Sequence, residues 1–199
     1  MRKVQDYYFN RAKKDNYPAR SVYKLEEAQK KYRIMAAGNA VLDLGCQPGS
    51  WSLYAARTVG PRGIVVGVDL QEGQKTTIAG AADIVWLTAD VMAEDTVASV
   101  QKIRKKYRVV LSDIAPRTSG NRWVDQQQSL ALARRVVELA ATLLERGGNL
   151  YVKVFEGEDF KEFADSVRKI FKTVKIVKPK SSRKESREVF VLAMGFGEK

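Results

Sequence analysis

The sequence predicts an α/β protein whose seven-stranded, mostly parallel sheet carries helices on both faces. Short apolar, β-branched runs alternate with helical patterns, which is typical of parallel βαβ units. The last two runs are joined by residues 179–187 alone, a connection too short for a crossover helix, so they should form an antiparallel C-terminal hairpin. The chain has 199 residues and is 45% hydrophobic. We therefore expect one domain over 1–199 with a sizeable core.

The first half of the chain should supply two helices and three strands. Apolar side chains fall on one face of the segment 20–33, which predicts an amphipathic helix. The apolar run Ala40–Leu44 breaks at Gly45 and predicts a buried strand. Pro48 and Gly49 then turn the chain, and Ser50 is expected to cap a helix over 51–58. Two further β-branched runs predict strands over 63–69 and 84–87.

The second half continues the alternation and ends in the hairpin. Leu130, Ala133, Val137, Ala140 and Leu144 form one stripe of the longest helical pattern, which Gly147 and Gly148 should end. The expected helices are 94–106, 125–145 and 159–171, and the expected strands are 108–113, 149–155, 173–178 and 188–194.

Composition excludes several kinds of site. The chain has no His and one Cys. Mechanisms that need an imidazole, internal disulfides and Cys-rich zinc sites are therefore excluded, and no metal is expected. The sequence contains no apolar run of about 18 residues, and its start lacks the apolar region of a signal peptide. We expect a cytoplasmic protein without membrane contact, in which Lys, Asp, Glu or Tyr handles any proton.

The positive charge is concentrated near both ends of the chain. Thirty-five Lys and Arg against 23 Asp and Glu give a formal net charge of +12. Residues 1–33 have ten basic and four acidic side chains, and residues 168–187 have nine and one. Two basic segments around a nearly neutral body predict a polyanionic partner such as a nucleic acid. A lysine-rich solvated surface is the alternative that charge alone leaves open.

A glycine-containing turn predicts a nucleoside cofactor. In such sheets, ligands bind at the carboxyl ends of the strands. Here the first strand ends in Asp43-Leu44-Gly45 and Gly49 follows, without the G-x-G-x-x-G pattern of pyrophosphate binders. Asp69 ends the second strand, where a carboxylate can bind ribose hydroxyls, and Asp90, after the third, could bind an adenine amino group. This pattern favours S-adenosylmethionine, which has an ammonium and no pyrophosphate. Trp51 either packs beside the cofactor or anchors its helix, and Cys46 is interpreted as a small filler.

Three charged residues interrupt apolar strands. Asp113 ends the fourth strand, Lys153 lies inside Tyr151–Phe155, and Glu188 opens the last strand. A lone lysine in a buried run is costly unless it is paired. The alternatives are a Lys153 that reaches water at the strand end and a Glu188 on the surface.

At these residues the sequence resembles the FtsJ/RrmJ family of ribosomal RNA (ribose-2′-O)-methyltransferases. The resemblance covers nearly the whole chain. Ser50 and the pair Cys46-Gln47 depart from the glycine and small residues usual in bacterial members. The resemblance rests on the motifs Arg20–Leu25, Val41–Gly45, Pro48–Ser52, Leu111–Pro116, Ser119-Gly120, Val152–Gly157, Lys178–Arg183 and Ser186–Phe190.

The resemblance implies a Rossmann-like, S-adenosylmethionine-dependent fold and a set of site residues. The family's catalytic tetrad falls on Lys24, Asp113, Lys153 and Glu188. Residues 1–33 would be a basic helical extension that contributes to the active site and to RNA binding. Cofactor contacts are expected from Asp43, Gly45, Gly49, Trp51, Asp69, Asp90 and Asp113. Phosphate contacts are expected from Arg2, Lys3, Arg11, Lys13, Lys14 and Arg20 and from Lys178, Lys180, Arg183 and Lys184.

The implied reaction is methyl transfer from S-adenosylmethionine to a ribose 2′-hydroxyl, with S-adenosylhomocysteine as product. Its substrate would be a uridine of large-subunit ribosomal RNA, free or in the ribosomal subunit, and the enzyme would be a monomer. Lys153 could act as a neutral base or as a cation. Three alternatives stay open: the same chemistry on tRNA, an enzyme acting on a small hydroxyl or amine, and a non-catalytic RNA-binding ribosome assembly factor.

Overall fold

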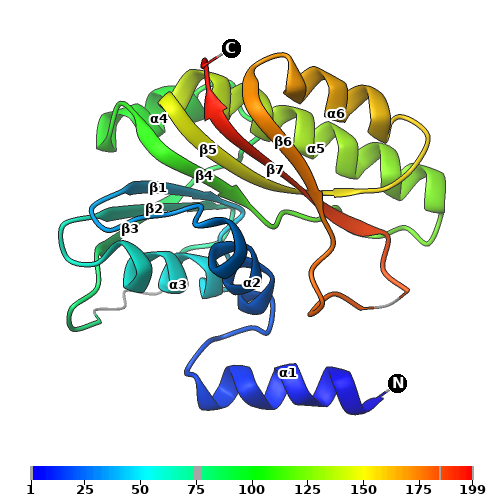
Figure 1. Ribbon diagram of the computed structural model, residues 1–199, viewed down its shortest axis with the longest axis horizontal. Coiled ribbons are helices and arrows are strands. Elements are labelled where there is room, and N and C mark those ends of the chain that lie inside the picture. The colour runs from blue at the N-terminus through cyan, green and yellow to red at the C-terminus, as the bar shows by residue number, and fades with distance from the viewer. Residues whose placement is uncertain (1, 74–77, 184, 199) are drawn as a thin grey trace.

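One sheet runs through the centre of the molecule (Figure 1). The computed structural model describes residues 2–73, 78–183 and 185–198, with backbone alone for 2–6. Within these residues seven strands form the sheet. They are β1 (Ala40–Leu44), β2 (Ile64–Asp69), β3 (Asp83–Thr88), β4 (Tyr107–Ser112), β5 (Leu144–Phe155), β6 (Phe171–Val177) and β7 (Glu188–Phe196).

The strand order places a switch point beside β1. The order is β3-β2-β1-β4-β5-β7-β6, and β1 pairs in parallel with both β2 and β4. From β1 the chain crosses over to β2 on one side, and from β3 it crosses back to β4 on the other side of β1. The carboxyl end of β1 is therefore the point at which α/β sheets bind ligands. The predicted antiparallel hairpin is confirmed, with β7 inserted between β5 and β6.

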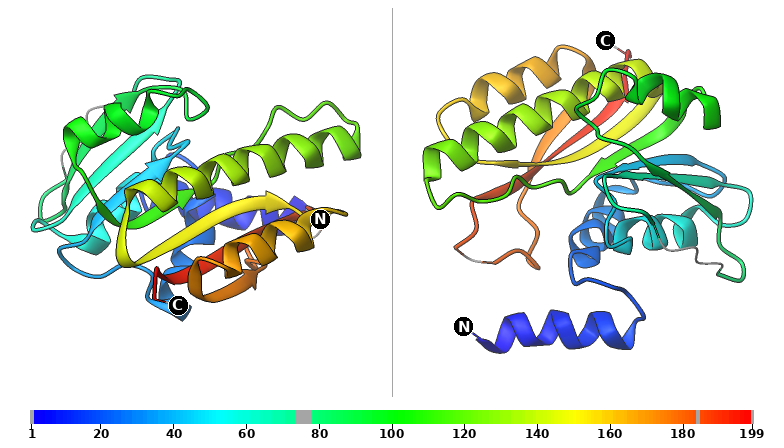
Figure 2. Two further views of the ribbon diagram at one scale, coloured as in Figure 1. Left: turned by 90° about the horizontal axis from the view of Figure 1, so that it is seen from above. Right: turned by 180° about the vertical axis from the view of Figure 1, so that it is seen from behind.

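Helices cover both faces, as predicted (Figure 2). Helices α2 and α3 pack on one face, through Leu25, Trp51 and Ala55, and helices α4, α5 and α6 pack on the other. Helix α1 lies beyond α2, away from the sheet (Figure 1). No helix in the described part of the chain is both long and apolar enough for a membrane span. The helices are α1 (Arg2–Lys14), α2 (Val22–Tyr32), α3 (Ser50–Val59), α4 (Thr96–Ile103), α5 (Arg122–Leu143) and α6 (Phe160–Arg168).

Two local predictions are wrong. Ser50 does not cap α3, because Gly49 precedes the helix in a left-handed conformation and Ser50 is its first residue. The Ser50 Oγ accepts a hydrogen bond from the Ala19 backbone N–H at 2.7 Å instead, which ties the N-terminal segment to α3. Gly147 and Gly148 do not end α5, because that helix ends at Leu143 and both glycines lie inside β5.

The ends of three helices also differ from the predicted bounds. Helix α5 begins at Arg122, three residues earlier than predicted, because the Asn121 side chain caps it. It stops early because Leu144 pairs with Tyr107 of β4. Helices α4 and α6 are shorter than the segments 94–106 and 159–171, since residues at their ends join turns and strands. Strand pairing overrides helical periodicity at these ends.

Candidate active site

Carboxylates from three successive strand ends surround one cavity of about 400 Å³. Asp69, Asp90 and Asp113 line it, and Ile114 and Leu132 add apolar surface. The Asp69 carboxylate accepts hydrogen bonds from the backbone N–H groups of Gln47 at 3.1 Å and Gln71 at 3.0 Å. These bonds fix its position and leave further lone pairs for a ligand. The cavity has the size and mixed polarity of a small-molecule site.

The turn after β1 brings backbone close to this cavity and to a smaller recess beside it. Gly45 has a φ of 72°, and a Cβ there would lie 2.1 Å from the Ile114 side chain. Gly49 has a φ of 98° and lies against the Trp86 ring, and it is not among the residues that line the cavity of about 400 Å³. Glycine is therefore required at Gly45 for close approach and favoured at both positions by backbone conformation. Gly45 lines the main cavity, whereas Gly49 serves to start α3.

Asp43 lies at the floor of a smaller recess of about 30 Å³, which Trp51 and Asp113 also line. Only 1% of Asp43 is exposed, and its Oδ2 accepts a hydrogen bond from the Ser52 hydroxyl at 2.6 Å. Burial raises the pKa of the Asp43 carboxyl to about 7, since the charged form loses its hydration. Cys46 is also buried, in agreement with its interpretation as a small filler.

The structure brings together all four residues of the expected tetrad. Lys153 Nζ lies 2.9 Å from Asp113 Oδ1 and also donates a hydrogen bond to the Asp113 backbone carbonyl. Lys24 Nζ lies 3.6 Å from the same Oδ1 and 2.9 Å from Glu188 Oε1. The order Glu188–Lys24–Asp113–Lys153 alternates in charge and sums to zero. Each charge thus has an opposite partner, which lowers the cost of burying it.

The surroundings of Glu188 lower the pKa of its carboxyl. Burial alone would raise its pKa, but the Lys24 ammonium beside it holds the pKa of the carboxyl below its usual value. Glu188 is therefore ionised at neutral pH and keeps Lys24 in place.

Aromatic side chains fix the helix that carries Lys24. The Trp51 Nε1–H donates to the Ser21 carbonyl at 2.9 Å, and the Tyr151 hydroxyl donates to the Lys24 carbonyl at 3.4 Å. The Trp51 and Tyr151 rings stack with their centroids 5.6 Å apart, and the Phe190 ring packs on both. Trp51 thus anchors the segment that leads into α2, and because it also lines the recess beside Asp43, its contact with a cofactor stays a prediction.

The basic residues near the ends of the chain divide into exposed and engaged groups. Arg11 is engaged, since it pairs with Glu26 at 3.1 Å and with Asp15 at 3.3 Å and covers the Tyr23 ring. Arg20 is half-buried. The side chains of Arg2 and Lys3, and Lys184 entirely, lie outside the described residues. The exposed members are Lys13, Lys14, Lys178, Lys180 and Arg183.

Sequence reasoning missed the contact that holds the second basic segment. The Glu27 carboxylate of α2 accepts hydrogen bonds from the backbone N–H groups of Lys180 at 2.7 Å and Ser181 at 3.0 Å. Glu27 therefore ties the 178–187 loop to the helix that carries Lys24. No pattern in the sequence signals this contact, because its partners lie more than 150 residues apart and one side is backbone.

The chain is similar to known proteins over nearly its whole length. The sequence profile of the FtsJ-like methyltransferases matches residues 17–196. A "Ribosomal RNA large subunit methyltransferase E" of Desulfotalea psychrophila is 54% identical over 98% of both chains. A relative of the same name from Desulfosudis oleivorans is 45% identical over 100% of this chain and 93% of its own.

Solved structures share the fold at low sequence identity. A ribosomal RNA methyltransferase structure from Plasmodium falciparum has a TM-score of 0.78 at 23% identity, covering 92% of this chain and 100% of its own. An rRNA methylase structure from Clostridium thermocellum has a TM-score of 0.58 at 17% identity, covering 86% and 97%. The Rossmann-like architecture expected from the sequence is thereby confirmed.

Proposed function

The chain belongs to the FtsJ-like methyltransferase family, and from this membership we propose that it transfers the methyl group of S-adenosylmethionine to a ribose 2′-hydroxyl of RNA. One observation carries the proposal: the paired Lys24, Asp113, Lys153 and Glu188 adjoin a cavity of small-molecule size at the switch point of the sheet. A purely RNA-binding protein would have no need for a buried lysine, a largely covered second lysine and two carboxylates in one cluster.

The proposed substrate is a uridine of large-subunit ribosomal RNA, presented in the ribosomal subunit. The curated relatives quoted above are named for this RNA, and the basic segments of this chain suit a polyanion. An enzyme with this substrate would work in the cytoplasm, and we propose that it acts as a monomer. Residues 1–33 would contribute Lys24 and phosphate contacts to one methyltransferase domain over 1–199.

The residues around the two cavities fit S-adenosylmethionine. Asp69 offers free carboxylate lone pairs to ribose hydroxyls, and Asp90, whose Oδ1 accepts the Met92 N–H at 2.9 Å, can accept from an adenine amino group. Asp43 and the Gly45 backbone would meet the ammonium end of the cofactor. Bound there, S-adenosylmethionine supplies an electrophilic methyl on a sulfonium.

Lys153 is proposed to act as a cation. Two oxygens of Asp113, the carboxylate Oδ1 and the backbone carbonyl, both lie against its Nζ and hold it in one position. As the O–CH₃ bond forms and the S–CH₃ bond breaks, the electron pair of the broken bond returns to sulfur and the hydroxyl proton leaves to water. The Lys153 ammonium would lower the energy of the negative charge that develops on the 2′-oxygen.

The other three members of the tetrad would position the reacting groups. Asp113 holds Lys153 and borders the cofactor cavity, so it links the two reactants. Glu188 holds Lys24, and Lys24 would place the ribose through a hydrogen bond. Holding both reactants in line can contribute as much as charge stabilisation does.

The deciding experiment supplies methyl-labelled S-adenosylmethionine and three RNAs to the purified protein. Large ribosomal subunits from a strain lacking the corresponding gene should be methylated on a ribose 2′-oxygen, which nucleotide-resolution mapping locates. Labelling of tRNA instead would show that tRNA is the substrate. If none of the three RNAs (subunits, free ribosomal RNA and tRNA) is labelled, the proposal is refuted. The scheme assigns no step to a metal, so loss of activity with EDTA would also count against it.

A further inference from the structure

Trp123 is a large aromatic side chain that the fold leaves exposed. It lies in the first turn of α5 and is 64% exposed, whereas Trp51 is 3% exposed. Tryptophan is usually well buried, so an exposed one next to a proposed nucleic-acid site indicates a contact surface. The buried residues of α5 begin at Asp125, so Trp123 contributes nothing to the packing of this helix.

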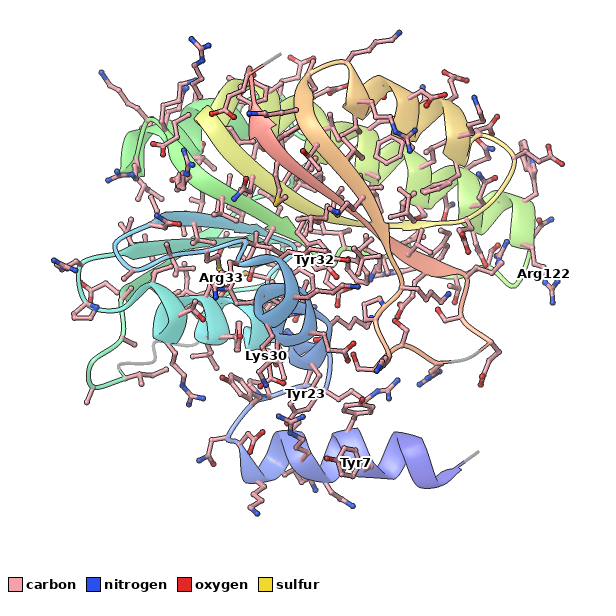
Figure 3. All side chains as sticks on the ribbon, in the orientation of Figure 1. Tyr7, Tyr23, Lys30, Tyr32, Arg33 and Arg122 are labelled. Carbon is pink, nitrogen blue, oxygen red and sulfur yellow. The ribbon has the colours of Figure 1, made fainter. Side chains whose placement is uncertain are left out.

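Two arginines, Arg122 and Arg187, lie near the backbone of this tryptophan. Arg122 precedes it and is exposed, and both terminal nitrogens of Arg187 donate to the Arg122 carbonyl at 3.2 Å. Figure 3 shows Arg122 at the end of α5, beside the start of β7. A guanidinium has five N–H donors, so Arg187 keeps donors free for a phosphate. Asp125 is buried, and the exposed acids nearby are Glu185 of the adjoining loop and Glu156, whose backbone N–H donates to the Arg187 carbonyl at 2.9 Å.

The backbone under Trp123 is held rigidly. The Asn121 Oδ1 accepts the N–H groups of Trp123 at 3.0 Å and Val124 at 3.2 Å. The Asp125 carboxylate accepts both the N–H of Ser119 at 2.6 Å and its hydroxyl at 2.8 Å, which fixes the loop that leads back to Asp113. A preorganised aromatic surface loses little conformational freedom when it binds.

Trp123 is also connected to the tetrad. Arg187, whose guanidinium reaches Arg122, directly precedes Glu188. Arg187 therefore links the first turn of α5, which carries Trp123, to the strand start that carries Glu188.

We propose that Trp123 stacks on an unpaired base of the substrate RNA, next to the nucleotide that is methylated, while Arg122 and Arg187 contact the flanking phosphates. The proposal rests on the proposed RNA substrate. A base offers an apolar face to an indole ring whatever its identity, so this subsite holds the strand without reading its sequence. It would keep the target ribose from sliding past the tetrad.

Three variants separate stacking from charge. Trp123→Ala should weaken binding of a short, fluorescently labelled single-stranded RNA by at least about fivefold, the lower end for one lost base–aromatic stack. Trp123→Phe should keep most of the affinity. Arg122→Ala should reduce the salt dependence of binding, whereas Trp123→Ala should weaken binding by the same factor at every salt concentration. Arg134→Ala, on the same helix, is the matched control and should bind like the wild type.

A second readout uses the fluorescence of the tryptophan itself. RNA should quench the emission of the wild type, and Trp123→Phe should lose most of that quenching at unchanged melting temperature. Wild-type affinity in Trp123→Ala overturns the proposal. So does a variant that is slower on whole subunits but normal on the oligonucleotide, which would assign Trp123 to a protein contact. If the wild type methylates none of the three RNAs while RNA still quenches Trp123, the proposed function fails and the stacking site stands.

Discussion

Lys153 is only 7% exposed and is paired with one residue, Asp113, so its replacement tests the reaction more directly than any other change. Lys153→Ala should lower kcat by at least about 10²-fold, because a preorganised charge at the reacting oxygen is lost. Its affinity for S-adenosylmethionine, measured by calorimetry, should stay within about twofold of the wild type. Near-wild-type turnover would remove Lys153 from the mechanism.

Lys153→Arg distinguishes a cation from a base at this position. Arginine stays charged and cannot accept a proton at ordinary pH. A cationic role therefore predicts more turnover in Lys153→Arg than in Lys153→Ala. Equal inactivity of both variants would indicate a neutral base instead.

Asp69 tests the assignment of the main cavity. Asp69→Ala removes the carboxylate that is proposed to accept from the cofactor's ribose, along with its bond to the Gln47 N–H. The affinity for S-adenosylmethionine should fall by about 10-fold or more, as expected for the loss of a charged hydrogen-bond acceptor. Unchanged affinity by calorimetry would exclude the ribose role.

Asp43 makes cofactor binding depend on pH. Its pKa is raised to about 7 by burial, so the carboxyl is largely neutral at pH 6 and largely ionised at pH 8. The ionised form alone attracts the cofactor's ammonium. Affinity for S-adenosylmethionine should therefore rise from pH 6 to pH 8 in the wild type and be flatter in Asp43→Asn. Parallel pH profiles from calorimetry would show that Asp43 does not meet the ammonium.

At the scale of elements, α2 joins the tetrad to the 178–187 loop. It carries Lys24, and its Glu27 binds the backbone of the 178–187 loop. Glu27→Gln weakens these charge-assisted bonds, so the loop should lose its fixed position. The KM for RNA should rise about 2- to 10-fold while the affinity for S-adenosylmethionine stays constant. Glu162→Gln, on α6, is the control, and equal KM values for both variants would contradict the coupling.

The strands and most helices were predictable because their patterns are local. The run Ala40–Leu44 is apolar at every position except Asp43, and it is β1 residue for residue. The end of α5 was not predictable, since it depends on Leu144 pairing with Tyr107, more than 30 residues away. The insertion of β7 between β5 and β6 leaves no local signal either.

The residues of the candidate site also differ in whether a local pattern in the sequence identifies them. Asp113, Lys153 and Glu188 stand out in the sequence because a charge inside a buried strand needs a partner. Lys24 lies on an ordinary amphipathic helix and was identified by resemblance alone. The role of Glu27 was beyond sequence reasoning, and the bonding partner of Trp51 was too, because each depends on which backbone N–H or carbonyl lies opposite the side chain.

On the scale of the whole molecule, two exposed basic groups reach the proposed RNA from different elements. Lys14 ends α1, which lies on the far side of α2 from the sheet, and Arg183 lies on the 178–187 loop (Figure 1). If about five phosphates are contacted, the logarithm of the binding constant should fall with the logarithm of salt concentration at a slope near −4.

Single variants then measure each contribution to that slope. Lys14→Ala and Arg183→Ala should each make the slope shallower by about 1, and the double variant by about 2, because the two residues contact separate phosphates. Lys161→Ala, on α6, removes an equal charge that pairs with Asp165 at 3.0 Å. Its slope should match the wild type, because long-range charge is screened within about 10 Å at 0.1 M salt. If all three single variants change the slope equally, RNA binding depends on the net charge of the protein and not on separate phosphate contacts of Lys14 and Arg183.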